Sequence, residues 1–306
     1  MKKIFITGAT GYLGSAVTSK LKSRGFRVSG LARNSRSAAE LEQKEIEAVA
    51  GKLSDLKILK IAARDADGVI HTAFEHSGDY SQNARLDREV IGAFGDAMAG
   101  TDKPLIIAST SAILADTKTI EADEDHPFDP GSSRAVRGEA ERDIQQMSQK
   151  GVRAIALRLP LFVYGNGGSL FLPKLIEFAK QAGSANYPGS GEQMFSAIHI
   201  EDAADLFLAA LETSTAKGVY NAATESITLK ELSESIARML HLKAKRISDD
   251  EARRQFGGMF EFLSKSNRLS ADKVLRETDW IPSAFRKIED DIENGSYRIL
   301  KGKNNE

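Results

Sequence analysis

The sequence predicts an α/β fold, a doubly wound parallel sheet with a smaller, discontinuous C-terminal lobe. Three observations lead to this prediction. The chain opens with an apolar segment, residues 4–7, followed by glycines spaced three apart and then by a helical pattern. Strand and helix patterns then alternate through roughly the first two hundred residues. After Pro160 this order gives way to a glycine-rich stretch of mixed polarity.

The first strand–helix–strand unit is complete within about thirty residues. Leu13, Val17 and Leu21 recur every four residues and form one face of a helix. Gly25 ends that helix, and residues 26–31 have the apolar character of a second strand. This order predicts two parallel strands joined by a crossover helix.

Three glycines, Gly8, Gly11 and Gly14, follow the first strand. Glycine permits a tight turn and lets a phosphate-bearing ligand approach the main chain without meeting a Cβ atom. The free N–H groups and the dipole at the start of the next helix favour an anion at the same place. A turn that only packs helix on sheet would explain one glycine, so three at even spacing predict dinucleotide binding.

Four further strands and two long helices are predicted in the same part of the chain. The strands are residues 46–49, 67–72, 105–108 and 152–159, and the helices are residues 54–64 and 81–100. In a parallel, doubly wound sheet, ligands bind outside the carboxyl ends of the strands. Residues that directly follow each strand are therefore the candidates for a site.

The second lobe is predicted from the change of pattern. Residues 161–195 carry six glycines and one helical segment, residues 172–181. Thr228 with Glu231 and Ser248 with Glu251 have capping-box spacing and predict two later helices. We expect a nucleotide-binding domain of residues 1–160 plus 196–218 and a substrate lobe of residues 161–195 plus 219–306, with the substrate between them.

The end of the second strand indicates which dinucleotide binds. NAD-binding folds usually place an acidic residue there to hold the ribose 2′-hydroxyl. Here Arg33 and Arg36 follow the strand, and no acid stands at its edge. A guanidinium binds a 2′-phosphate through charge-assisted hydrogen bonds, so the sequence predicts NADP(H) over NAD(H). A solvated loop arginine is the alternative, and it suits Arg36 better than Arg33.

Composition excludes several classes of function. The 306 residues carry 42 basic and 43 acidic side chains, which gives no electrostatic case for nucleic acid or an anionic membrane. The absence of cysteine excludes disulfides, thiolate metal sites and a thiol nucleophile, and five scattered histidines lack metal-ligand spacing. We expect a cytoplasmic protein with no metal, no nucleic-acid partner and no membrane anchor.

Six segments, in order along the chain, carry a family resemblance. They are TGATGYLG (7–14), VIHTAF (69–74), LRLPLFVYG (157–165), HIEDAA (199–204), VYN (219–221) and DWIP (279–282). Together they resemble the extended short-chain dehydrogenase/reductases, in an atypical branch. The resemblance implies an NAD(P)-binding Rossmann fold and, in many members, a dimer through the helices near 81–100 and 134–149; we expect a monomer or homodimer.

The resemblance also implies a set of cofactor-binding positions at the strand ends. These are Gly8, Thr10, Gly11, Tyr12, Leu13, Gly14, Arg33, Arg36, Leu53, Thr72, Ala73, Phe74, Ser109, Pro160 and Phe162.

The family's chemistry uses a Ser or Thr after the fifth strand and a Tyr-x-x-x-Lys pair, and the tyrosine is missing here. Ser111 falls at the first of these positions. Aligning the family's helix glutamate with Glu141 puts Ser133 at the Tyr position and Arg137 at the Lys position. We take Ser111 and Arg137 as catalytic candidates. A slip of one residue gives Arg134 and Gly138 instead, while Ser133 as a helix cap and an Arg137–Glu141 pair are structural alternatives.

Other tyrosines and histidines have weaker claims. The one Tyr-x-x-x-Lys match, Tyr297 to Lys301, lies at the far C-terminus and is interpreted as coincidence. Tyr164 is expected to be structural, and His76 and Tyr80, after the fourth strand, are positioned to line the substrate entrance. His71 is expected to be buried and His199 to orient the second lobe. Apolar residues of that lobe predict either core or an apolar pocket: Phe162, Phe171, Leu172, Met194 and Phe195.

The function expected from these observations is an NADP(H)-dependent oxidoreductase acting on a small-molecule aldehyde or ketone, a carbonyl reductase in the reductive direction. Two alternatives remain open. One is a cofactor-sensing protein that binds NADP(H) with little or no turnover, which fits the missing tyrosine. The other is an epimerase or isomerase of the same fold, because fold does not fix chemistry.

Overall fold

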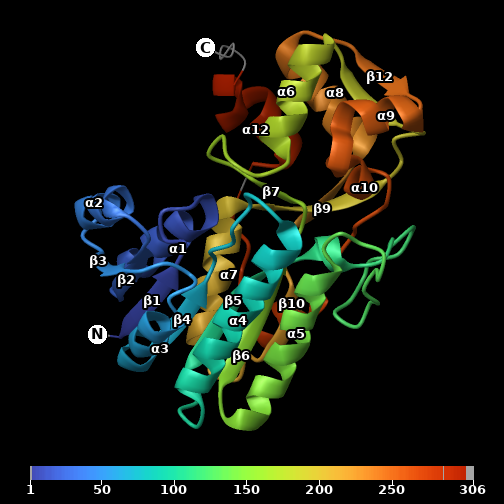
Figure 1. Cartoon of the computed structure of the whole chain (residues 1–306). Helices are drawn as coiled ribbons and strands as arrows, with labels where there is room; N and C mark the ends of the chain where they lie inside the picture. Colours follow the sequence, from blue (N-terminus) through green and yellow to red (C-terminus); the bar gives the residue numbers. More distant parts are fainter. Residues whose placement is uncertain (1, 285, 301–306) are drawn as a thin grey trace.

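A seven-stranded parallel sheet forms the centre of the computed structural model, which describes residues 2–284 and 286–300 (Figure 1). The strand order is β10-β6-β5-β4-β1-β2-β3, and all six pairings are parallel. The strands are β1 (Lys3–Thr7), β2 (Arg27–Ala32), β3 (Glu47–Ala50), β4 (Gly68–His71), β5 (Pro104–Thr110), β6 (Arg153–Leu159) and β10 (Gly218–Asn221). The order reverses between β1 and β4, so the crevice at their carboxyl ends is the expected ligand site.

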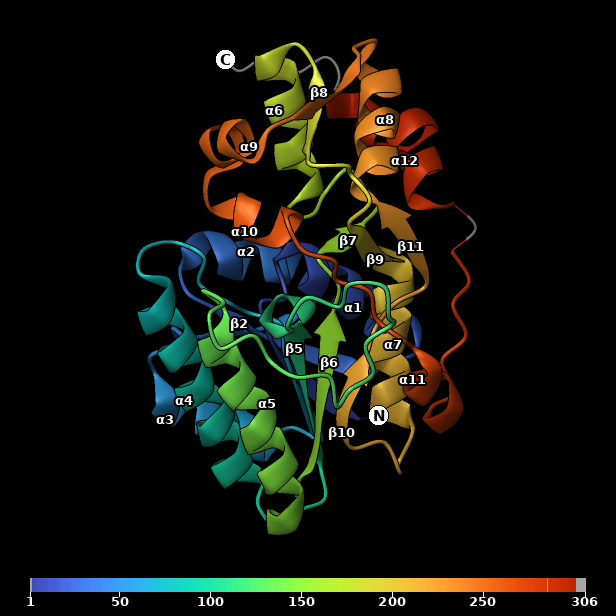
Figure 2. The ribbon, with the colours of Figure 1, turned by 90° about the vertical axis from the view of Figure 1, so that its right-hand side faces the viewer.

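Helices cover both faces of this sheet, which confirms the predicted doubly wound fold (Figure 2). On one face α1 (Tyr12–Ser23) packs against α7 (Ile200–Glu212). On the other face α4 (Tyr80–Met98) packs between α3 (Leu56–Asp65) and α5 (Ala135–Met147). Helix α2 (Ser35–Gln43) packs on β2 and β3. Among the residues described, no helix is both long and apolar enough to cross a membrane.

The second lobe lies over the carboxyl ends of the sheet strands and has its own apolar core (Figures 1 and 2). It contains a three-stranded sheet, β11-β9-β7, and a two-stranded sheet, β12-β8. Its elements are β7 (Phe162–Tyr164), α6 (Leu172–Ala182), β8 (Ala185–Pro188), β9 (Met194–His199), β11 (Glu225–Thr228), α8 (Leu229–Leu240), β12 (Ala244–Ile247), α9 (Asp249–Phe256), α10 (Phe260–Leu263) and α12 (Ile288–Asn294). Both capping boxes form, at the starts of α8 and α9, as predicted.

The border between the two parts differs from the predicted one. Strand β10 continues the main sheet beside β6, so residues 219–221 lie in the nucleotide-binding part and not in the second lobe. Strand β9 pairs with β7 and β11, which places residues 196–199 in the second lobe's sheet. The later helix α11 (Asp272–Glu277) returns to pack on β10. These crossings depend on pairings between distant segments, which local patterns do not reveal.

Candidate cofactor and active site

The glycine turn fits a dinucleotide. Gly8 has a φ of 76°, and a Cβ there would lie 2.8 Å from the main-chain nitrogen of Ala73 at the end of β4. A Cβ on Gly14 would lie 2.0 Å from the Gly8 oxygen, so α1 can approach β1 only with glycine at position 14. In the described chain, no side chain caps α1 at Gly11 and its first turn has no acidic residue. The N–H groups there are therefore available to a pyrophosphate.

The region beyond β2 holds a charge pair that the sequence analysis missed. Arg33 follows β2 and its side chain is 70% exposed, and its Nη1 lies 3.4 Å from Oε2 of Glu75 in the segment after β4. Hydrogen bonds from Ser77 lower the pKa of Glu75, so this carboxylate is charged at neutral pH. Arg36 is exposed in the first turn of α2. An acid therefore does stand beside the predicted 2′-phosphate position, supplied by a different strand end.

Several predicted cofactor residues are also bound to the protein itself. The Thr72 hydroxyl donates to the Thr7 carbonyl at 2.8 Å, which fixes Ala73 against Gly8. Leu53, just beyond β3, is partly buried and packs against the core to which α3 and α4 contribute. Thr10 and Leu13 are partly buried at the glycine turn.

Tyr12 joins the glycine turn to the second lobe. Its hydroxyl donates to the Gly165 carbonyl at 2.8 Å. The ring packs so closely on Gly168 that a Cβ there would lie 2.3 Å from a ring carbon. Burial strongly raises the pKa of Tyr12. Tyr297 is fully buried, and its hydroxyl accepts from the Gly165 N–H and donates to the Gly168 carbonyl. Tyr297 is therefore engaged by the main chain of residues 165–168; Lys301, the other half of the Tyr-x-x-x-Lys match, lies outside the described residues.

A buried polar network ties α5 to the sheet. Ser109 donates to the carboxylate of Glu141, which pairs with Arg158 at 2.6 Å. Arg158 also donates to the side-chain oxygen of Asn221 at 3.1 Å. The Ser109 side chain is therefore engaged within the protein and not directed at a cofactor. Because Glu141 pairs with Arg158, the suggested Arg137–Glu141 pair does not form.

Arg137 instead reaches the end of β5. Its Nη2 donates to the Ala108 carbonyl at 2.7 Å, and its Nε lies 3.6 Å from the buried carboxylate of Asp87. The same carboxylate is 2.9 Å from Nε2 of His71, which is buried as expected. Burial raises the pKa of Asp87, but the charge of Arg137 and the bond to His71 outweigh it and hold that pKa below its usual value.

The geometry favours the alignment that has Arg137 at the Lys position. Gly138 packs on the Phe128 ring, and a Cβ at position 138 would lie only 2.7 Å from that ring. The alignment shifted by one residue places the family's lysine at this position, where no side chain fits. Ser133 does not cap α5, because Arg134 is the N-cap residue and no side-chain capping bond forms in this described segment. Ser133 instead donates its main-chain N–H to Glu261 at 2.9 Å.

Ser111 has an unusual environment. It begins a short 3-10 turn, Ser111–Ile113, directly after β5, and it is fully buried. Its Oγ has no hydrogen-bond partner among the described residues, and neither has the side-chain oxygen of Asn267. The Asn267 amide donates to the Ser111 carbonyl at 2.9 Å, so the two unpaired atoms belong to residues in contact. Buried polar atoms rarely remain unpaired unless a ligand or water completes them.

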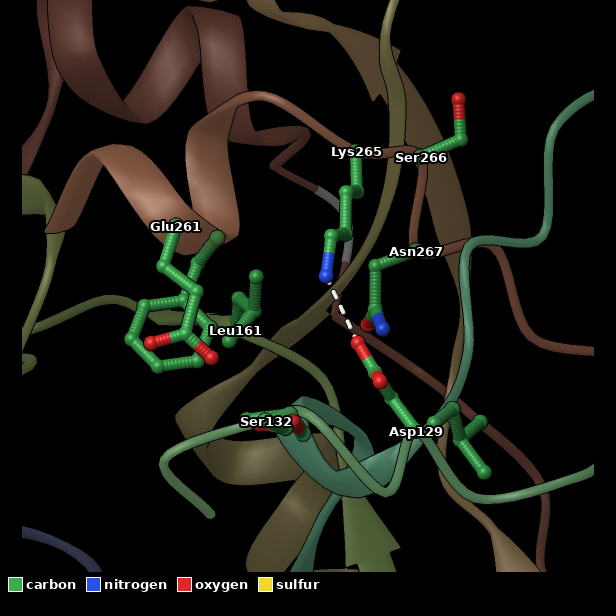
Figure 3. A pocket seen from close by; sticks show the side chains of 10 residues that line it. Asp129, Ser132, Leu161, Glu261, Lys265, Ser266 and Asn267 are labelled. Atoms are coloured by element: carbon green, nitrogen blue, oxygen red, sulfur yellow. Dashed lines mark hydrogen bonds and ion pairs between the residues drawn. The ribbon is translucent and has the colours of Figure 1, made fainter. Parts of the chain in front are cut away.

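A small pocket lies between the two lobes (Figure 3), and its lining residue Asn267 bonds to the Ser111 carbonyl. Lys265 and Asp129 face each other across it with an N···O distance of 2.6 Å, and the hydrogen bond from Lys265 lowers the pKa of Asp129. The pocket is lined by Ala112, Leu114, Asp129, Ser132, Leu161, Glu261, Phe262, Lys265, Ser266 and Asn267. Asn267 and Lys265 follow α10, far along the chain from β5, and no local pattern marked them.

Of the five apolar residues proposed as pocket or core, Phe162, Leu172 and Phe195 lie in the core of the second lobe and Phe171 packs against it, while Met194 is only partly buried. Phe162 is fully buried, with its ring against Phe171 and Phe195. Its side chain therefore points into the second lobe and cannot face the cofactor, while Pro160 ends β6 beside the site. The Tyr164 hydroxyl lies within hydrogen-bond distance of the Glu225 carboxylate and of the Arg286 carbonyl, which makes it structural as expected. Among the described residues, no group of three His, Asp or Glu side chains gathers as a metal site.

The sheet, the glycine turn and the polar residues beyond β5 define a dinucleotide-binding α/β protein of the short-chain dehydrogenase/reductase type. The chain belongs to the NAD dependent epimerase/dehydratase family, whose model matches residues 4–223. This confirms the predicted family and makes the chain one of a group of NAD(P)-dependent oxidoreductases and epimerases.

Similar proteins support this assignment. An uncharacterized Schizosaccharomyces pombe protein is 37% identical over 92% of this chain and 95% of its own length. An uncharacterized Saccharomyces cerevisiae protein is 34% identical over 94% and 97%. The Thermus thermophilus UDP-glucose 4-epimerase, solved in complex with NAD, has a TM-score of 0.73 at 21% identity and covers 98% of this chain and 99% of its own; this likeness shows the fold.

Proposed function

We propose that this protein is an NADP(H)-dependent oxidoreductase that reduces an aldehyde or ketone or oxidises the matching alcohol. The observation that carries the proposal is the buried, unpaired hydroxyl of Ser111 beside Asn267 at the end of β5. A carbonyl oxygen placed there would accept the hydrogen bond that Ser111 lacks. A relative of 27% identity over 71% of this chain, from Stigmatella aurantiaca, is named 4-hydroxy-2-methyl-3-oxo-4-farnesyl-3,4-dihydroquinoline-1-oxide ketoreductase.

Each side chain has a stated role in this proposal. When bound, the nicotinamide ring supplies or accepts the hydride. Ser111 polarises the substrate carbonyl by donating a hydrogen bond to the substrate oxygen. The side-chain amide of Asn267 holds Ser111 in place by donating to the Ser111 main-chain carbonyl. Arg137, oriented by Ala108 and Asp87, provides positive charge at the sheet end, where charge develops on the substrate oxygen. The substrate is a small molecule, and the protein acts as a monomer or homodimer.

The preference for NADP(H) depends on Arg33. A 2′-phosphate would draw Arg33 away from Glu75 and form charge-assisted hydrogen bonds with it. The test compares dissociation constants for NADPH and NADH in the wild type and in Arg33→Asp. We expect the wild type to prefer NADPH and the variant to lose that preference. Equal preference in both proteins contradicts the assignment.

The oxidoreductase activity is tested by NADPH consumption across a panel of aldehydes and ketones. Ser111→Ala is expected to lower kcat by about 100-fold, the scale of losing one preorganised donor. NADPH binding with a silent panel would favour the cofactor-sensing alternative, which Ser133 at the tyrosine position supports. Tightly bound NAD that survives purification would favour an epimerase, a role compatible with the structural neighbours that hold NAD.

A further inference from the structure

Aromatic and cationic side chains gather at the inner ends of α4 and α5. We call Phe74, His76, Tyr80, Arg134 and Arg137 the arginine–aromatic cluster. Three of its members come from the segment that leaves β4 and starts α4, and two come from the start of α5. The proposed function uses only Arg137 of this cluster. It does not say which group donates the proton to the substrate oxygen, a role that Ser133 at the tyrosine position cannot fill.

Tyr80 is held from two sides within the cluster. The guanidinium carbon of Arg134 lies 3.7 Å from the centre of the Tyr80 ring, a close cation–π contact. The centres of the Phe74 and Tyr80 rings are 5.2 Å apart. The guanidinium of Arg137 lies over the Phe74 ring, 4.6 Å from its centre. The phenol is therefore oriented by packing and not left free at the surface.

The cluster is continuous with the site beyond β5. Arg137 donates to the carbonyl of Ala108, three residues before Ser111 on the same strand end. Arg137 also stands at the position of the family's lysine. A phenol beside this cation reproduces the pairing of tyrosine with lysine, although Tyr80 comes from α4 and not from the helix that carries the usual motif.

The charges around Tyr80 suit a proton donor. The groups that face it are Arg134 and Arg137 from α5, Asp87 from its own helix, and His76 through Phe74. Partial burial raises the pKa of Tyr80, and the positive charges of the two arginines offset this only in part. The phenol therefore keeps its proton at neutral pH, and the arginines remain close enough to stabilise a phenolate once the proton has left.

We propose that Tyr80 is the catalytic proton donor of this protein, in place of the tyrosine that is missing at position 133. The inference rests on the proposed function. In the reductive direction the carbonyl carbon gains the hydride, the O–H bond of Tyr80 breaks, and its proton forms the O–H bond of the product alcohol. Tyr80 then recovers a proton from water; oxidation of an alcohol reverses each transfer.

The kinetic test compares the wild type with Tyr80→Phe and the control Tyr187→Phe, whose residue lies in β8 of the second lobe. The probes are NADPH with para-nitrobenzaldehyde and with phenanthrenequinone. We expect Tyr80→Phe to lower kcat by about 100-fold or more and to abolish the basic limb of the pH profile, because proton donation contributes on this scale. NADPH affinity should stay within about twofold, and Tyr187→Phe should match the wild type. Wild-type kcat with an unchanged basic limb in Tyr80→Phe overturns the inference.

A second test needs neither cofactor nor substrate. The alkaline absorbance titration of the wild type minus that of Tyr80→Phe reports the ionisation of Tyr80 alone. Arg134→Gln, at a half-buried position, should move this titration to higher pH because one stabilising charge is removed. An unmoved titration contradicts the inference. If the wild type consumes no NADPH with any carbonyl, the proposed function fails first, and the titration still decides whether Tyr80 is coupled to the arginine.

Discussion

Arg33 and Glu75 are the two residues on which the proposed preference for NADP(H) depends. Arg33 directly follows β2, Glu75 lies in the segment after β4, and the fold brings the two side chains to 3.4 Å. An exposed pair of this kind contributes little to stability. Under the proposed preference for NADP(H), the pair matters through competition, because Glu75 contacts the guanidinium that a 2′-phosphate would use.

We predict that Glu75→Gln strengthens NADPH binding by about threefold to tenfold, since Arg33 loses a competing anion and the phosphate loses a repelling one. NADH affinity should change by less than about twofold. Calorimetric titration of both cofactors measures this. The interpretation is wrong if both affinities rise equally or if neither changes, and Glu89→Gln on α4, an exposed acid on another face, is the control.

Asp87 provides a prediction about pH. The pKa of Asp87 is lowered in the folded protein, since Arg137 and His71 outweigh the effect of burial. The charged carboxylate therefore stabilises the fold above the unfolded pKa of about 3.9. This stabilisation is lost as the pH falls through the folded pKa. Asp87→Asn should therefore lower the free energy of unfolding at neutral pH, and the difference from wild type should shrink below about pH 4. Urea unfolding at several pH values tests this; a difference independent of pH contradicts it.

At the scale of elements, the chain's own periodicity carries most of the information. The six strands predicted in the first 160 residues and the helices over 54–64, 81–100 and 172–181 match the structure to within a few residues. Each has a local apolar pattern and a turn or cap at its ends. Strands β7, β8, β9, β10, β11 and β12 were not predicted, because each is defined by a pairing partner far along the chain.

The contact between β1 and α1 gives a prediction for an element. Gly14→Ala places a Cβ 2.0 Å from the Gly8 oxygen and should force α1 away from β1, lowering stability by about 2 kcal/mol or more and abolishing NADPH binding. Gly92→Ala on α4 is the matched control, since its Cβ meets nothing within 4 Å. That variant should gain about 0.5–1 kcal/mol from helix propensity. Thermal unfolding and NADPH titration measure both; tight NADPH binding by Gly14→Ala would contradict the predicted turn.

At the scale of the whole molecule, the site is assembled from distant segments. Ser111 could be predicted because it follows a strand that the sequence itself reveals. Asn267 and Lys265 could not, since they reach the pocket only when the segment after α10 returns to β5. Glu75 and Tyr80 fall between these cases: their strand was predicted, but their partners on other elements were not.

Tyr12 connects the two parts of the molecule and yields a prediction at this scale. Tyr12→Phe removes the hydrogen bond to Gly165, which should cost about 1 kcal/mol and speed amide exchange in residues 165–168. Hydrogen exchange followed by mass spectrometry measures this, with Tyr187→Phe as the control. Unchanged exchange in residues 165–168 would contradict this and would mean that the bonds from Tyr297 and Ser296 suffice to hold the segment.

The most direct test of the central claim follows the hydride itself. NADPH carrying deuterium at nicotinamide C4, prepared in each stereochemical form, is incubated with the protein and the carbonyl panel, and the products are analysed by mass spectrometry. We predict an alcohol that carries one deuterium on its carbinol carbon, from one of the two labelled forms. Bound NADPH that keeps all its deuterium, with no labelled alcohol, would contradict it.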